Sequence, residues 1–222
     1  MSGSSPAERL SQVRSVVAKA ASLARRGPGE VTLIAASKTC AAESIIPLLE
    51  AGHRDFGENR VQEAQAKWPP LRERFPDIAL HLIGRLQSNK AEEAVALFDC
   101  IHSVDRASLV GALVRAAEKT GRIPKCFIQV NIGDEPQKGG CPVAELPALL
   151  ERSGDAGLSI AGLMCIPPAQ VEPAPYFALL AMLGRRHGLP DLSMGMSADF
   201  ETAVTIGATH VRVGTALFGE RQ

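Results

Sequence analysis

Short apolar runs alternate with segments of helical periodicity along most of the chain. The runs are rich in aliphatic and β-branched residues and predict strands over residues 32–37, 54–57, 78–84, 98–104, 124–132, 158–164, 191–196 and 209–214. Between them, apolar residues at helical spacing predict helices over 42–51, 59–68, 88–97, 105–120, 142–153, 173–187 and 198–207. Strands that alternate with helices in this way indicate a parallel sheet with the helices outside it.

The number of strand–helix units favours one closed architecture. Eight units in 222 residues fit a compact (β/α)8 TIM barrel, near the short end for that fold. An open, doubly wound sheet is the competing α/β fold, but its GxGxxG signature after the first strand is missing. The chain shows no linker and no shift in composition. We therefore expect one domain over residues 1–222, with an extra N-terminal helix within 1–30 and the barrel within 31–222.

Charge and cysteine content narrow the classes of function. The chain has 24 basic and 24 acidic side chains, so it lacks the basic excess of a protein that neutralises many phosphates of a nucleic acid. No apolar run approaches the roughly 20 residues of a membrane span, and the start MSGSSPAERL lacks the apolar core of a secretory signal. Five scattered cysteines without a CxxC pair are typical of reduced thiols. We expect a cytoplasmic monomer without nucleic-acid or membrane partners.

Polar and glycine residues follow several expected strands at the end where α/β folds bind their ligands. They include Ser37, Lys38 and Thr39 after the first strand, Glu58 and Asn59 after the second, Ser197 after the seventh, and Gly214 and Thr215 after the eighth, and the apolar Met164 stands at the end of the sixth. Because these strand ends share one rim of a barrel, the residues after them are the candidate site.

The segment HVRVGTALFG at residues 210–219 contains a candidate anion site. Gly214 lets the backbone approach a ligand closely, and TALFG can begin a helical turn whose free N–H groups face an anion. A plain strand exit explains Gly214 and Thr215 equally well from their positions alone. Arg212 points either into the barrel, where its charge needs a ligand or a carboxylate, or outward to an ion pair with a helix.

Lys38 ends the apolar run VTLIAAS, which raises the question of its role. It is either an exposed lysine at a strand end or an amine held in the barrel mouth as a nucleophile for a carbonyl group. A Schiff-base lysine opposite a phosphate site indicates a phosphorylated aldehyde. Pyridoxal 5'-phosphate and a sugar phosphate handled by an aldolase both fit this description.

Seven segments in chain order carry a resemblance to a known family. They are AASKT, FGENRVQEA, HLIGRLQSNK, QVNIGDEPQKGG, GLMCIPP, LSMGMSADFETA and THVRVGTALFGER. From about residue 31 to 221 the chain resembles the pyridoxal phosphate homeostasis proteins, which are similar to the N-terminal barrel domain of alanine racemase standing alone. The resemblance implies a barrel that binds pyridoxal 5'-phosphate without a well-established turnover.

The resemblance also implies roles for the two candidate cations and for the phosphate loop. Lys38 would hold the cofactor as a Schiff base. Arg212 would face the pyridine nitrogen, where a cation cannot accept a hydrogen bond from a protonated nitrogen as a carboxylate does, so the ring stays unprotonated and is a poorer electron sink. Ser197 and the backbone amides of Gly214 and Thr215 would hold the phosphate.

Further positions are implied to lie near the ring or in loops. Asn59 and Met164 would lie against the cofactor ring. Arg85 stands where the family usually has proline. The sequence QKGG at residues 137–140 replaces the KxG-type ending that is more usual in the family. Both departures are expected in loops, outside the cofactor core.

The same resemblance implies how a carrier of the cofactor differs from a racemase. A racemase of this barrel type needs a second base, which alanine racemases supply as a tyrosine from an additional β domain. This chain ends eight residues after Gly214, and its one tyrosine, Tyr176, is expected on the barrel exterior. His81 and Cys40 are expected to be packed residues.

We therefore expect a carrier or buffer of pyridoxal 5'-phosphate in vitamin B6 homeostasis, with apo-forms of pyridoxal-phosphate enzymes as candidate partners. An amino-acid racemase of weak activity is the alternative, and a sugar-phosphate lyase is a third reading.

Overall fold

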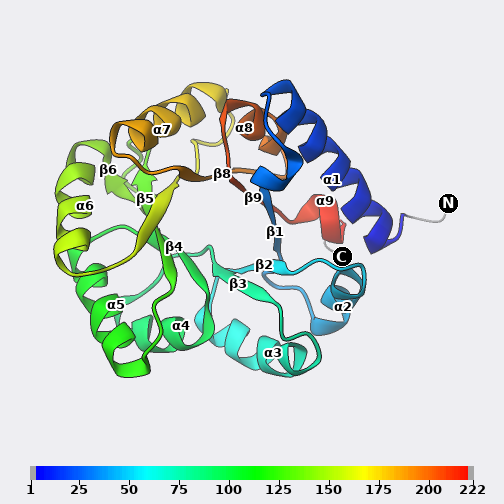
Figure 1. Ribbon diagram of the computed structural model, residues 1–222, viewed down its shortest axis with the longest axis horizontal. Helices are drawn as coiled ribbons and strands as arrows, with labels where there is room; N and C mark the ends of the chain where they lie inside the picture. Colours follow the sequence, from blue (N-terminus) through cyan, green and yellow to red (C-terminus); the bar gives the residue numbers. More distant parts are fainter. Residues whose placement is uncertain (1–3, 220–222) are drawn as a thin grey trace.

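The computed structural model describes residues 4–219, and its strands close into one parallel barrel (Figure 1). The barrel strands are β1 (Thr32–Ala36), β2 (Asp55–Glu58), β3 (Ala79–Leu82), β4 (Cys100–Val104), β5 (Lys125–Asn131), β7 (Ile160–Met164), β8 (Asp191–Met196) and β9 (His210–Val213). Each strand pairs in parallel with the next, and β9 returns to β1, which closes the ring. The short strand β6 (Cys141–Pro142) pairs with the end of β5. The predicted TIM barrel is confirmed, and the open sheet is wrong.

The helices surround the barrel as a ring (Figure 1). They are α1 (Pro6–Leu23), α2 (Ala42–Glu50), α3 (Val61–Arg74), α4 (Ala91–Leu97), α5 (Ala107–Thr120), α6 (Leu146–Asp155), α7 (Ala174–Arg186), α8 (Phe200–Ile206) and α9 (Thr215–Phe218). Short 3-10 turns occupy Pro28–Glu30, Ser88–Lys90 and Val143–Glu145. Within residues 4–219, no helix combines the length and the apolar character needed to cross a bilayer.

The expected N-terminal helix is present as α1. It begins with a capping box, in which Ser5 Oγ accepts the Glu8 N–H at 3.2 Å and Glu8 Oε2 accepts the Ser5 N–H at 2.7 Å. Its buried face packs against α8 and α9, and Arg9 Nε donates to the Leu217 carbonyl at 2.7 Å. This contact ties the start of the described chain to its last helix, next to the rim of the barrel.

The end of one helix differs from the prediction, because two prolines do not terminate it. Helix α3 continues through Pro69 and Pro70 to Arg74, although proline inside a helix removes a hydrogen bond and costs about 3 kcal/mol. Burial of Trp68 and Leu71 against the core offsets that cost. The last two residues of the motif THVRVGTALFGER, and the outermost ends of the expected domain, lie outside the described residues.

Candidate functional site

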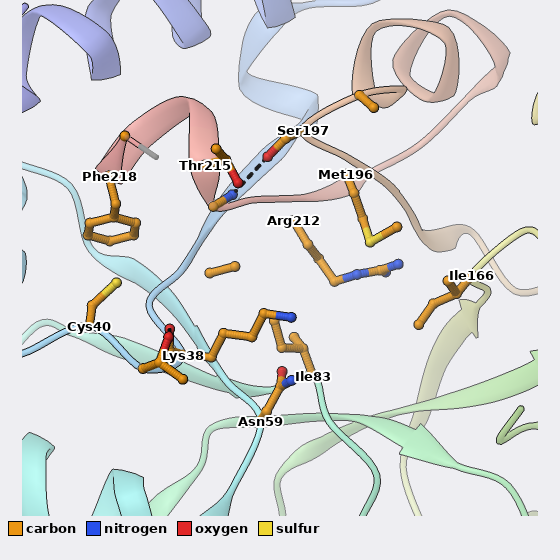
Figure 2. A pocket seen from close by; sticks show the side chains of 15 residues that line it. Lys38, Cys40, Asn59, Ile83, Ile166, Met196, Ser197, Arg212, Thr215 and Phe218 are labelled. Carbon is orange, nitrogen blue, oxygen red and sulfur yellow. Dashed lines mark hydrogen bonds between the residues drawn. The ribbon is translucent and has the colours of Figure 1, made fainter. Parts of the chain in front are cut away.

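A cavity of about 430 Å³ opens at the carboxyl ends of β1, β2, β8 and β9. Six of the seven expected site residues line it: Lys38, Asn59, Ser197, Arg212, Gly214 and Thr215. Ile83, Ile166, Met196 and Phe218 add apolar side chains on several sides of the cavity (Figure 2). The strand ends that were named from the sequence therefore meet at one rim.

Lys38 extends from the end of β1 into this cavity, towards the side that Ile83 and Arg212 occupy (Figure 2). The residue is half-buried, and within residues 4–219 its ammonium group has no hydrogen-bond or ion-pair partner. A lysine that is partly removed from water usually pairs with a carboxylate. Its amine is instead left available to a ligand in the cavity.

A buried ion pair holds the turn that carries Lys38. Lys67 Nζ lies 2.6 Å from Glu58 Oε1 and donates to the carbonyls of Ser37 and Cys40 at 2.9 and 3.1 Å. Glu58 is fully buried, and its Oε1 also accepts from Ser37 Oγ at 2.6 Å and from Trp68 Nε1 at 3.1 Å. The two carbonyls bracket the cavity lysine, so this ion pair fixes both ends of its turn.

Arg212 points into the barrel, which the alternation along its strand could not decide. It is 4% exposed, and its guanidinium donates to Ser193 Oγ at 2.6 Å and to the Cys165 carbonyl at 2.9 Å. Within the described chain no carboxylate pairs with it, so the alternative of an outward ion pair is wrong. Burial lowers the pKa of Arg212 below its ordinary value.

A chain of hydrogen bonds continues from Arg212 through the barrel interior. Ser193 Oγ lies 2.9 Å from His102 Nδ1, His102 Nε2 lies 3.0 Å from His81 Nδ1, and His81 Nε2 lies 3.2 Å from Asp55 Oδ1. Burial lowers the pKa of His102 well below its ordinary value, so this ring is neutral. The chain therefore links the cavity cation to a carboxylate at the amino-terminal end of β2.

The loops after β8 and β9 are joined where the phosphate was expected. Ser197 Oγ accepts the Gly214 N–H at 3.2 Å, the contact drawn as a dashed line in Figure 2. A Cβ atom on Gly214 would lie 3.3 Å from the Ala36 carbonyl oxygen, so a side chain there would crowd the cavity wall. Because Gly214 has no side chain, its backbone can lie directly against a ligand in the cavity.

Four other residues discussed from the sequence lie in different settings. Met164 does not line the cavity, because it is fully buried and packs with Cys100 and Phe127 inside the barrel. Tyr176 lies on α7 and packs against the outer side of the core. Arg85 is exposed, and Cys40 lines the cavity.

The lining residues define the chemistry that the cavity can accept. Lys38 and Arg212 are its cations, and the lining residues of the described chain include no carboxylate. An anionic ligand is therefore favoured, and an electrophilic carbon can react with the unpartnered amine. A phosphorylated aldehyde meets both requirements.

Comparisons with known proteins agree with this chemistry. The family model for the N-terminal domain of alanine racemase matches residues 10–222. A protein of Aquifex aeolicus named pyridoxal phosphate homeostasis protein is 41% identical, over 97% of this chain and 98% of its own. The chain belongs to the pyridoxal phosphate homeostasis protein family. The resemblance found in the seven sequence segments is thus confirmed.

Solved structures place this pyridoxal phosphate homeostasis protein family member beside PipY of Synechococcus elongatus. PipY without pyridoxal phosphate superposes with a TM-score of 0.86 at 43% identity, over 97% of this chain and 100% of PipY. PipY with pyridoxal phosphate bound gives a TM-score of 0.84 at 42% identity, with the same coverage.

Some residues that shape the site were missed by sequence reasoning. Glu58 was noted only as a polar residue at a strand end, and its partner Lys67 lies on α3 with no signal of its own. A carboxylate directly after the buried residues Phe56 and Gly57 was the available signal, because such a group needs a partner. Ile166 offered no comparable pattern as a cavity residue.

Proposed function

We propose that this family member binds pyridoxal 5'-phosphate in the cavity and holds it as a Schiff base on Lys38. The observation that carries the proposal is the unpartnered, half-buried ammonium of Lys38, which faces a cavity that contains a second cation and a glycine-bearing loop. The relatives' shared name and the pyridoxal-phosphate-bound PipY structure support this ligand over a sugar phosphate.

Each lining residue has a role in this proposal. Ser197 Oγ and the amides of Gly214 and Thr215 bind the phosphate, and Asn59 lies beside the ring. Arg212 faces the pyridine nitrogen and, because a guanidinium can only donate a hydrogen bond, that nitrogen stays unprotonated. The bound cofactor supplies an aldehyde carbon and a conjugated ring that can act as an electron sink. Ile83 and Ile166 take the apolar contact that the sequence had assigned to Met164.

The cavity supports a carrier or buffer better than a racemase. Proton exchange on both faces of an amino acid needs an acid and a base on opposite sides. The lining residues within 4–219 include no carboxylate, imidazole or phenol that could act as the second base opposite Lys38. We infer a role in vitamin B6 homeostasis, with apo-forms of pyridoxal-phosphate enzymes as recipients. The cytoplasmic location and the monomeric state stay predictions.

The absorption spectrum with added pyridoxal 5'-phosphate tests this function. We expect a yellow protein whose visible band disappears on borohydride treatment. Reduction should leave the phosphopyridoxyl group covalently bound to the peptide that contains Lys38, and peptide mapping locates this label. Lys38→Ala should lose the band, whereas Lys119→Ala, on an exposed helix face, should keep it. A colourless wild type, or a label on another lysine, would overturn the proposal.

Solvent deuterium exchange separates the carrier from the racemase. The protein loaded with pyridoxal 5'-phosphate is incubated in D₂O with a panel of amino acids, and deuterium at Cα is measured. A carrier should show no exchange above that of the free cofactor. Exchange that depends on Lys38 and exceeds this background would favour the racemase alternative.

A further inference from the structure

Three side chains with metal-binding atoms meet inside the barrel, away from the cavity. A ring nitrogen of His81, a ring nitrogen of His102 and Cys100 Sγ all lie within 4.8 Å of one another. His81 Nδ1 and His102 Nε2 are 3.0 Å apart, and all three residues are buried. The cofactor site proposed above uses none of these atoms.

Strand register explains why these residues converge. His81 on β3 pairs directly with Cys100, the first residue of β4. His102 follows Cys100 by two residues, so both side chains point to the same face of β4. That face is the barrel interior, since Cys100 packs with Phe127 and Met164 there.

Two imidazoles and one thiolate are a ligand set typical of zinc. Zinc binds histidine nitrogen at about 2.0–2.1 Å, which places two tetrahedral nitrogen ligands about 3.3 Å apart. The separation of 3.0 Å between His81 Nδ1 and His102 Nε2 is close to that value. Cys100 Sγ lies within 4.8 Å of these nitrogens, and tetrahedral sulfur and nitrogen ligands of zinc are about 3.6 Å apart, so binding requires the thiol to move towards them.

Each histidine of this group already has the outer partner that a metal-bound imidazole uses. His81 Nε2 lies 3.2 Å from Asp55 Oδ1, a carboxylate oxygen that accepts a hydrogen bond from the remaining ring N–H. His102 Nδ1 lies 2.9 Å from Ser193 Oγ. Such second partners fix the ring orientation and raise the basicity of the bound nitrogen. Their presence distinguishes this group from an incidental contact of three buried side chains.

We propose that His81, Cys100 and His102 form a binding site for Zn²⁺ or a similar divalent cation. Starting from neutral rings, binding releases the Cys100 thiol proton to solvent. The His102 ring proton moves from Nε2 to Nδ1, and this N–H then donates a hydrogen bond to Ser193 Oγ. Three protein ligands leave a fourth position for water.

The amino-terminal end of the barrel provides the entrance. Asp55, the outer partner of His81, keeps 35% of its side chain exposed. It also lines a second cavity of about 550 Å³ between α1 and the first strands, together with Arg14 and His53. Asp55 thus connects this cavity to the proposed site, because it lines the cavity and contacts His81.

Cobalt titration of the chelator-treated protein without pyridoxal 5'-phosphate tests this site. We expect one equivalent of Co²⁺ to bind, with visible d–d bands and a near-ultraviolet thiolate-to-cobalt band that Zn²⁺ abolishes. Cys100→Ser should lose the near-ultraviolet band. Cys126→Ser, which changes a buried thiol on the neighbouring strand β5, should retain it. Lys38→Ala should also retain it, so failure of this site and failure of the proposed function are distinguishable.

Two further measurements keep the test decisive. Circular dichroism establishes that each variant is folded, and Cys100→Ala replaces Cys100→Ser if the serine variant is not. For the wild type, one equivalent of Zn²⁺ should raise the thermal midpoint. Absence of saturable cobalt binding in the wild type, or an unchanged spectrum in both Cys100 variants, would overturn the proposal.

Discussion

Lys67 and Glu58 form an ion pair of 2.6 Å, from Nζ to Oε1, beneath the turn that carries Lys38. The pair is nearly inaccessible, with side-chain exposures of 11% and 0%. Burying two charges costs about as much as their attraction returns, so such a pair is a weak source of stability by itself. The role of this pair is to position the turn that carries Lys38, because Lys67 also binds the carbonyls of Ser37 and Cys40 on either side of that lysine.

Lys67→Met should unfold more easily and hold the cofactor less well. The substitution leaves Glu58 buried without its cation, and breaking a buried pair in this way costs about 3–5 kcal/mol. The free energy of unfolding in urea measures the loss, and absorbance titration measures the dissociation constant for pyridoxal 5'-phosphate. The matched control is Lys119→Met, which breaks a pair with Glu92 on the surface and should cost less than about 1 kcal/mol. Equal stabilities for the two variants would contradict the cost of the broken buried pair, and an unchanged dissociation constant in Lys67→Met would contradict the positional role.

Gly214→Ala should weaken pyridoxal 5'-phosphate binding about tenfold, or about 1.4 kcal/mol, while the fold persists. The new methyl group would lie 3.3 Å from the Ala36 oxygen and 3.5 Å from its Cβ, so the wall of the cavity must shift. The control Gly154→Ala adds a methyl group in α6, where nothing lies within 4 Å, and should stabilise the helix by about 0.5–1 kcal/mol. A dissociation constant unchanged by Gly214→Ala would show that this loop does not contact the ligand.

Ser193→Ala should separate Arg212 from the buried histidines. Ser193 Oγ accepts from Arg212 and contacts His102, so its loss leaves buried polar groups without a partner and costs about 1–3 kcal/mol. Ser153→Ala is the control, because that hydroxyl is also buried but donates only to the Leu149 carbonyl within α6. Only Ser193→Ala should raise the dissociation constant for pyridoxal 5'-phosphate, measured by absorbance. Equal dissociation constants for the two variants would argue that Arg212 does not depend on Ser193.

Stability should fall as the pH drops from about 6.5 to about 4. Burial lowers the pKa of His53 to about 4 from its ordinary value of 6.5. In this window the unfolded chain binds a proton that the native state does not, so the free energy of unfolding rises with pH by about 1.4 kcal/mol per pH unit for this group. His210, with a pKa lowered to about 4 by burial, adds to the same slope.

His53→Gln isolates one share of that pH dependence. Glutamine can still donate to the Asp55 carbonyl, which His53 Nε2 contacts at 2.9 Å, but it does not titrate. Urea unfolding at several pH values between 4 and 7 should give a shallower slope for the variant. A slope identical to that of the wild type would show that His53 is not the titrating group.

The sequence by itself determined the barrel and most of the rim. Alternating strands and helices depend on local periodicity, and parallel strands all end at the same rim, so Lys38, Ser197 and Gly214 could be grouped without coordinates. Helix boundaries failed where tertiary burial overrode local preference, as at the prolines of α3.

Only the tertiary structure decided which side chains enter the barrel and which pairs meet. Strands of a closed parallel barrel are buried on both faces, so alternation separates the faces without saying which is interior. Arg212 was therefore undecided until the barrel was seen, and Met164, expected against the cofactor ring, packs instead with Cys100 and Phe127. The pairs Glu58–Lys67 and His81–His102 depend on how strands and helices distant in sequence are brought together, which no local pattern encodes.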